Sequence, residues 1–222
     1  MEQRVSDTGY QERRRFPPVL LALMAAIVGA FLLVSFASVD QQNAIFYALA
    51  LIPARFDATS AYHFAAWYDA LGPLFGHVFL HAGLLHIGMN MLVLLQVGPW
   101  VADRLGPSRF LTLFFLSALG GALAYILINA HSEMPAVGAS GAICGVFGAY
   151  FLSVRRSWRE ALADPAVRNA IGTFLFINVF LAGIASATGF LPIAWEAHLG
   201  GFVAGGAAYL ALGPRVPRGP WG

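Results

Sequence analysis

The sequence contains few charged residues and no lysine. Charged side chains make up 11% of the 222 residues, whereas hydrophobic side chains make up 59%. Soluble globular domains carry roughly 25% charged residues, so this composition excludes an ordinary soluble enzyme. All 13 basic residues are arginines and the net charge is only +2, which gives no indication of a nucleic-acid partner. We therefore expect one polytopic membrane domain.

Cysteine is also scarce. Cys144 is the single cysteine, so the chain cannot form an internal disulfide bond. Its neighbours are small and apolar, and we expect it to be a packing residue.

Six apolar runs are long enough to be membrane-spanning helices. Such a helix needs about 17 to 25 predominantly apolar residues. The first run is too long for the core of a signal peptide, which has about 7 to 15 apolar residues, so we expect it to remain as a span. The predicted spans cover residues 16–38, 82–101, 108–129, 138–154, 168–190 and 192–212.

The connection between the first two spans is long, and its apolar and aromatic residues favour a structure lying in the membrane interface. Arginines occur before the first span, between the second and third, between the fourth and fifth, and after the sixth. The positive-inside rule then places both termini in the cytoplasm. The predicted organisation is a tail over residues 1–15, a membrane domain over 16–212 and a second tail over 213–222.

Three predicted spans carry polar side chains near their outer ends. These are His86 and Asn90 in the second span, Ser140 in the fourth and His198 in the sixth. Polar groups are costly in lipid unless function or packing retains them. Their similar depth in three separate spans therefore predicts one shared site.

The fourth run is short, which places Ser140 below the membrane surface. Residues 138–154 rise about 25 Å as a helix, against a hydrocarbon core of roughly 30 Å. The first turn of a recessed helix offers free backbone N–H groups that can stabilise an oxyanion. His198 is able in principle to take the hydroxyl proton of Ser140, and His86 and Asn90 share one helical face.

Glycines in the fourth and sixth spans predict a close helix crossing. Gly141, Gly145 and Gly148 in one span and Gly201 and Gly205 in the other form GxxxG-type faces. Because Gly141 follows Ser140 and Gly201 lies three residues after His198, the same crossing would bring the hydroxyl and the imidazole together.

These residues together resemble the pattern of the rhomboid family of intramembrane serine proteases. The resemblance covers nearly the whole membrane domain and implies a six-helix, all-α bundle with a partly embedded loop after the first helix. The motifs that carry it are His81-x4-His86-x3-Asn90, Gly138-Ala139-Ser140-Gly141 and Ala197-His198-x2-Gly201-x3-Gly205.

The resemblance also implies roles for individual residues. Ser140 would be the nucleophile and His198 the general base and acid, with no third acidic residue. The backbone N–H of Ser140 and the side chains of His86 and Asn90 would hold the oxyanion. The fifth span would act as a lateral gate, with Met89 and Phe180 along it.

The implied activity is cleavage of other membrane proteins in or near a transmembrane helix, without a metal or an organic cofactor. Membrane lipid and transmembrane substrates are the expected partners. A short chain of this kind also resembles prokaryotic plasma-membrane members of the family. The chain departs from the family pattern at Ala102, where a glutamate is common, and at Cys144, where an aromatic residue is frequent.

Other interpretations of the same residues remain open. Ser140 and His198 can be packing residues, in an inactive relative that binds transmembrane helices or in a transporter with a polar path. A metalloenzyme would have to use histidines without an HExxH motif. We expect His77 and His81 to be structural, and Glu133 and Glu196 to be solvated interfacial charges.

Overall fold

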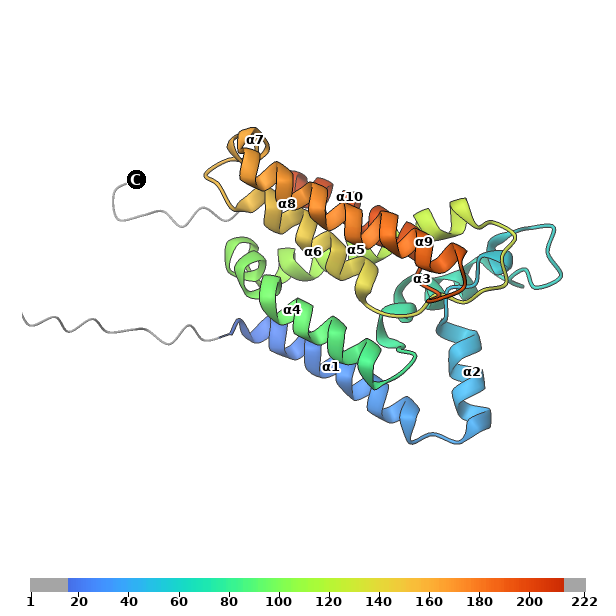
Figure 1. The fold of residues 1–222 in the computed structure, drawn as a ribbon. Helices are drawn as coiled ribbons and strands as arrows, with labels where there is room; N and C mark the ends of the chain where they lie inside the picture. Colours follow the sequence, from blue (N-terminus) through green and yellow to red (C-terminus); the bar gives the residue numbers. More distant parts are fainter. Residues whose placement is uncertain (1–15, 214–222) are drawn as a thin grey trace, which may run out of the picture.

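The computed structural model describes residues 16–213, which form an all-α membrane bundle (Figure 1). The predicted tail over residues 1–15 and nearly all of the one over 213–222 lie outside the described residues. The helical elements are α1 (Pro18–Ser35), α2 (Val39–Leu49), η1 (Pro53–Phe56), η2 (Trp67–Ala70), α3 (Leu71–Gly76), η3 (His77–Phe79), α4 (Leu84–Leu105), α5 (Pro107–Ile128), α6 (Ser140–Ser153), α7 (Trp158–Ala163), α8 (Pro165–Leu175), the π-helical η4 (Phe176–Leu181), α9 (Ala182–Ala187) and α10 (Trp195–Leu212).

Four helical segments are long and apolar enough to cross a membrane: α1, α4, α5 and the continuous segment Pro165–Ala187. The apolar helix α6 has only 14 residues, and α10 carries Glu196 and His198 near its start. A span count of six therefore stays a prediction for α6 and α10. The long connection after α1 contains α2, η1, η2, α3 and η3.

A single glycine joins α4 to α5. Gly106 has a φ of 75°, a left-handed conformation that residues with a Cβ atom rarely adopt. Pro107 follows as the first residue of α5, where its missing N–H costs nothing. This sharp turn sends α5 back beside α4.

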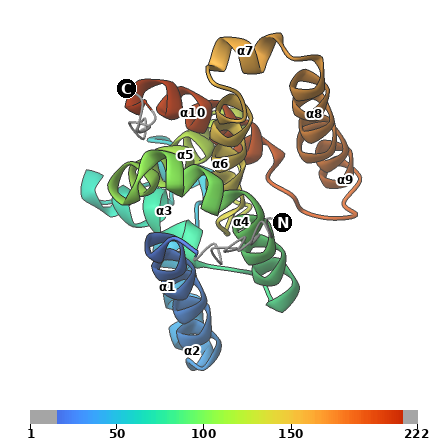
Figure 2. The ribbon, with the colours of Figure 1, turned by 90° about the vertical axis from the view of Figure 1, so that its left-hand side faces the viewer.

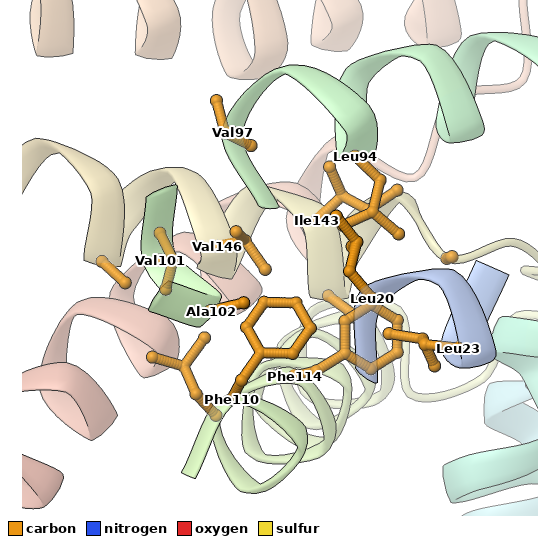
Figure 3. Close-up of a cluster of buried hydrophobic side chains, with 14 of the residues drawn as sticks. Leu20, Leu23, Leu94, Val97, Val101, Ala102, Phe110, Phe114, Ile143 and Val146 are labelled. Carbon is orange, nitrogen blue, oxygen red and sulfur yellow. The ribbon is translucent and has the colours of Figure 1, made fainter. Parts of the chain in front are cut away.

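The main hydrophobic core lies where α1, α4, α5 and α6 meet (Figure 3). Phe110 and Phe114 of α5 are fully buried and lie at the centre of the cluster. Leu20 of α1 and Leu94 of α4, also fully buried, pack into the same cluster. This core fixes α4 and α6 relative to one another, and the N-terminal ends of these two helices carry the candidate site.

Glycines allow α10 to pack directly on the backbone of α6. A Cβ atom added to Gly201 would lie 2.0 Å from the carbonyl oxygen of Gly141, and one added to Gly205 would lie 2.2 Å from that of Gly145. The other side of α10 contacts α5 equally closely, because a Cβ on Gly200 would lie 2.5 Å from the Gly120 oxygen. The sequence analysis identified the first crossing and missed the second.

The helices α8 and α9 lie at one edge of the bundle (Figure 2). Phenylalanines anchor the α8 end: the ring of Phe174 lies 4.6 Å from that of Phe147 in α6 and 5.3 Å from that of Phe202 in α10. The π-helical segment beyond it exposes Phe176, Ile177 and Phe180. The same segment also contacts α10, so one of its faces is packed while these side chains are exposed.

We predict that Gly205→Ala destabilises the bundle whereas Gly29→Ala does not. The added methyl group at position 205 would collide with backbone atoms of Gly145, while nothing lies within 4 Å of the same group at position 29. Overpacking of this kind costs about 1 to 3 kcal/mol. Thermal unfolding in detergent measures the effect, and equal midpoints for the two variants would contradict it.

Candidate active site

Ser140 is the first residue of α6, and a glycine turn sets its position. Gly138 has a φ of 113°, and its backbone N–H donates to the carbonyl oxygen of His77 at 2.9 Å. Ala139 is fully buried. Because the first backbone N–H groups of a helix have no partner within it, the N–H of Ser140 is available at the start of α6.

His198 lies in the first turn of α10, beside Ser140. Its Nε2 is 3.0 Å from the Oγ of Ser140, a hydrogen-bond distance between residues 58 positions apart in the chain. The crossing of α6 and α10 produces this contact, since Gly141 follows Ser140 and Gly201 lies three residues after His198. The structure thus brings together the predicted nucleophile and the predicted base.

A backbone carbonyl orients the imidazole. Nδ1 of His198 lies 3.2 Å from the carbonyl oxygen of Asn178, in the π-helical segment. A carbonyl can only accept, so Nδ1 carries the hydrogen and the Nε2 of the neutral ring keeps its lone pair toward Ser140. The sequence analysis missed Asn178, because a main-chain oxygen leaves no signal in side-chain identity.

His86 and Asn90 lie against the turn that precedes Ser140. A Cβ atom on Gly138 would be 2.7 Å from the Nε2 of His86 and 3.8 Å from the Nδ2 of Asn90. Asn90 Nδ2 donates to the carbonyl oxygen of His86 at 3.1 Å, which uses one of its two hydrogens. The backbone N–H of Ala82 donates to His86 Nδ1 at 3.4 Å, so the hydrogen of a neutral ring is on Nε2. Both side chains therefore offer an N–H beside Gly138, two residues before Ser140.

The predicted gate residues lie on two separate helical segments. Met89 of α4 is 53% exposed and Phe180 of the π-helical segment is 57% exposed. These segments pack on other helices rather than extensively on each other. The structure places both side chains on exposed surfaces, and their role in a gate stays a prediction.

The expectation for Glu196 is wrong. Its side chain is buried, with 7% exposed, and its Oε1 accepts a hydrogen bond from Asn129 Nδ2 at 3.1 Å. Asn129 follows the last residue of α5, so this bond ties that end of α5 to the start of α10, two residues before His198. Glu133, by contrast, is exposed as expected.

His77 has a structural environment, as expected. Its Nδ1 lies 2.7 Å from the carbonyl oxygen of Pro73, and its own backbone oxygen receives the N–H of Gly138. His81 is also buried. Among residues 16–213, no three His, Cys, Asp or Glu side chains are grouped so that they could hold a metal ion.

Several contacts join the long first connection to the loop before α6, among them a hydrogen bond from the Ala54 N–H to the Ser132 carbonyl oxygen at 2.9 Å. Leu51 and Ala136 form an isolated antiparallel bridge, and Nδ1 of His131 lies 2.7 Å from the carboxylate of Asp57. Hydrogen bonds from Thr59, together with the His131 contact, lower the pKa of Asp57 to about 2. The carboxylate is therefore ionised at neutral pH and can accept a hydrogen bond from His131.

Comparison with known proteins gives a consistent match. The profile of the rhomboid domain matches residues 67–215. RHOMBOID-like protein 5 of Arabidopsis thaliana is 33% identical over 129 residues, which are 58% of this chain and 40% of that protein. Rhomboid protease GluP of Bacillus subtilis is 32% identical over 147 residues, which are 66% of this chain and 26% of that protein.

One relative is named as inactive. Inactive RHOMBOID-like protein 8 of Arabidopsis thaliana is 28% identical over 125 residues, which are 56% of this chain and 33% of that protein. The chain thus spans less than half the length of each of these three relatives.

We predict that Asn129→Ala destabilises the protein by about 1 to 3 kcal/mol, the usual cost of leaving a buried polar group without its partner. The change removes the donor to Glu196. Thermal unfolding of the purified protein measures it, with the exposed Glu133→Gln as a control that should match wild type. In the double variant Asn129→Ala, Glu196→Leu, part of the lost stability should return. An unchanged midpoint for Asn129→Ala would contradict the importance of this bond.

Proposed function

This chain belongs to the rhomboid family, and we propose from that premise that it is a serine endopeptidase that cleaves membrane proteins in or beside a transmembrane segment. The observation that carries the proposal is the 3.0 Å contact between Ser140 Oγ and His198 Nε2. Neither residue has a carboxylate partner among its hydrogen bonds in the described part of the chain, so the pair would act as a dyad.

The reaction would proceed in two displacement steps. Ser140 Oγ attacks the scissile carbonyl carbon while its proton passes to His198 Nε2. The Asn178 carbonyl holds the Nδ1–H of the resulting imidazolium. His198 then returns the proton to the leaving amine, which breaks the C–N bond and leaves an acyl-enzyme. Water, deprotonated by His198, releases the acid and restores Ser140.

Developing negative charge on the carbonyl oxygen would be met by three donors: the backbone N–H of Ser140, the second N–H of Asn90 and the Nε2–H of His86. Preorganised donors of this kind stabilise the transition state because they need no reorientation as the charge forms. The positive end of the α6 dipole acts in the same direction.

Substrates would approach between α4 and the segment from α8 to α9. The α8 end is anchored by the contacts of Phe174, whereas the half of the segment that follows contacts α10 through its π-helical turn and exposes Phe180. Displacement of this half, with Met89 on the opposite side, would admit a substrate helix. Small or helix-weakening residues at the scissile bond should be favoured, because its carbonyl must leave the helical ladder.

A six-span arrangement with both termini in the cytoplasm fits this proposal. Arginines gather at the end of the bundle opposite to Ser140, as the positive-inside rule expects of the cytoplasmic end. On that side Arg104 stacks on Trp100, and Arg155 pairs with Asp164. We keep the prokaryotic plasma membrane as the proposed location. The relatives come from a plant, a yeast, a second fungus and a bacterium, so they do not identify the compartment.

The second candidate function is that of an inactive relative that binds transmembrane helices without cleaving them. The similarity to a protein named as inactive is the reason for considering it. The Ser140–His198 contact favours the protease, because a binding protein has no need of a serine hydroxyl facing an imidazole lone pair.

We predict that Ser140→Ala and His198→Ala each abolish cleavage of a labelled transmembrane substrate in liposomes. Loss of a nucleophile or base lowers kcat by several orders of magnitude. Ser108→Ala changes an exposed serine at the start of α5 and should cleave like wild type. Thermal unfolding checks that all three variants are folded. Cleavage that survives Ser140→Ala would refute the mechanism, and no cleavage by wild type would favour the binding function.

We predict that Asn90→Ala lowers kcat by about 10²- to 10³-fold, as expected for loss of one oxyanion donor, with little change in KM. Steady-state cleavage of the same substrate separates the two constants. Gly88→Ala, at a position on α4 where an added methyl group meets nothing within 4 Å, is the control. A rise in KM at unchanged kcat would assign Asn90 to substrate binding instead.

A further inference from the structure

A cavity lined by charged side chains lies at the end of the bundle opposite to Ser140, between the end of α4 and the loop that joins α6 to α7. Figure 1 shows α7 and the last turns of α4 at this same end of the molecule. The volume of the cavity is about 390 Å³, within the range of about 300 to 1,000 Å³ that is usual for small-molecule sites. Its walls are formed by Arg104, Val154, Arg155, Arg156 and Glu160.

The charge of this cavity is mainly positive. Three of its five lining residues are arginines and one is a glutamate. Arg155 is already paired with the carboxylate of Asp164. Among residues 16–213, no carboxylate lies within ion-pair distance of Arg104 or Arg156. Cations that line one cavity repel each other, and an anion between them would remove that repulsion.

A fixed aromatic ring holds one of these arginines in place. The guanidinium of Arg104 lies 4.4 Å from the centroid of the Trp100 ring, and the Nε1 of Trp100 donates to the Oγ of Ser153 at 3.0 Å. Arg104 is half-buried, whereas Arg156 is exposed. The cavity therefore combines a held guanidinium with one that can approach a ligand from solvent.

The helix beside the cavity has the features of a membrane interface. Trp158 and Leu162 of α7 are exposed, and the guanidinium of Arg159 lies 5.3 Å from the centroid of the Trp158 ring. Tryptophan and arginine gather at the level of the lipid headgroups. In the orientation proposed above, this end faces the cytoplasmic leaflet, whose anionic lipids give it a negative surface potential. The anions nearest to the cavity would thus be lipid headgroups.

We propose that this cavity binds the headgroup phosphate of an anionic phospholipid. The phosphate oxygens would accept hydrogen bonds from Arg104 and Arg156, because the planar guanidinium group matches the geometry of phosphate. The acyl chains would extend into the bilayer beside the apolar side chains that α7 exposes. Since α7 packs on α6 and α8 rather than extensively on α4, the bound lipid would join the end of α4 to the loop between α6 and α7.

The experiment uses the full chain, purified in detergent and washed until it is free of lipid. Phosphatidylglycerol is added at increasing concentration, and native mass spectrometry counts the molecules retained. Arg104→Gln and Arg156→Gln each remove one cation from the cavity, and Glu160→Gln removes the lining carboxylate. Arg159→Gln is the matched control, because it removes the same charge from a nearby position that does not line the cavity.

Wild type and Arg159→Gln should each retain one phosphatidylglycerol with the same affinity. Arg104→Gln and Arg156→Gln should bind it about tenfold more weakly, the change expected for a lost hydrogen bond to a charged group. Glu160→Gln should bind it about threefold more tightly, because the carboxylate no longer repels the phosphate. Equal affinity in all five proteins, or weaker binding by Glu160→Gln, would overturn the proposal.

Thermal unfolding without lipid checks that every variant is folded. Arg104 stacks on Trp100, so Arg104→Gln can lose stability for a reason unrelated to lipid. Arg156→Gln changes an exposed side chain and tests the cavity even if Arg104→Gln does not fold. Unchanged binding by a folded Arg156→Gln would contradict the assignment of that arginine to the phosphate.

Separate titrations distinguish the sources of the anionic group. Phosphatidylcholine should bind more weakly than phosphatidylglycerol, because its choline cation would face the arginines. Inorganic phosphate should bind more weakly still, since it has no acyl chains to place in the detergent micelle. Binding of either one as tightly as phosphatidylglycerol would refute the proposal. These measurements require no catalytic turnover, so the lipid site and the proposed protease activity are tested separately.

Discussion

The close approach of α6 and α10 is the constraint on which the candidate site depends. Gly201 touches the backbone at Gly141, and Gly205 touches it at Gly145. Side chains larger than hydrogen at these positions would push the two helices apart. Ser140 and His198 lie in the first turns of the same two helices, so any separation would break their 3.0 Å contact. Helix packing in this protein thereby sets the geometry of the proposed chemistry.

The polar groups around this crossing are oriented largely by the main chain. The Asn178 carbonyl fixes the tautomer of His198, and the Ala82 N–H fixes that of His86. Backbone partners avoid placing a charged carboxylate next to the dyad in a membrane, where an unpaired charge is costly. The π-helical form of residues 176–181 is consistent with such a role, because π-helical turns occur frequently at functional sites.

Much of the fold was predictable because lipid imposes strong rules on sequence. Long apolar runs located α1, α4, α5 and the segment Pro165–Ala187 to within a few residues. The glycine spacing predicted the α6–α10 crossing, because helices in lipid pack closely through small residues. The burial of Glu196 was not predictable, since its partner Asn129 lies 67 residues away and only the folded chain brings them together. The hydrogen bond to the Asn178 carbonyl was not predictable either, because a residue of any type at that position supplies the same backbone oxygen.

The central claim is that the Ser140 hydroxyl is a nucleophile activated by His198. Its most direct test is to treat the purified protein with a serine-reactive fluorophosphonate and to locate the adduct by peptide mass spectrometry. The account predicts a single modified residue, Ser140, and no adduct after His198→Ala. An unmodified Ser140, or equal modification with and without the imidazole, would contradict it.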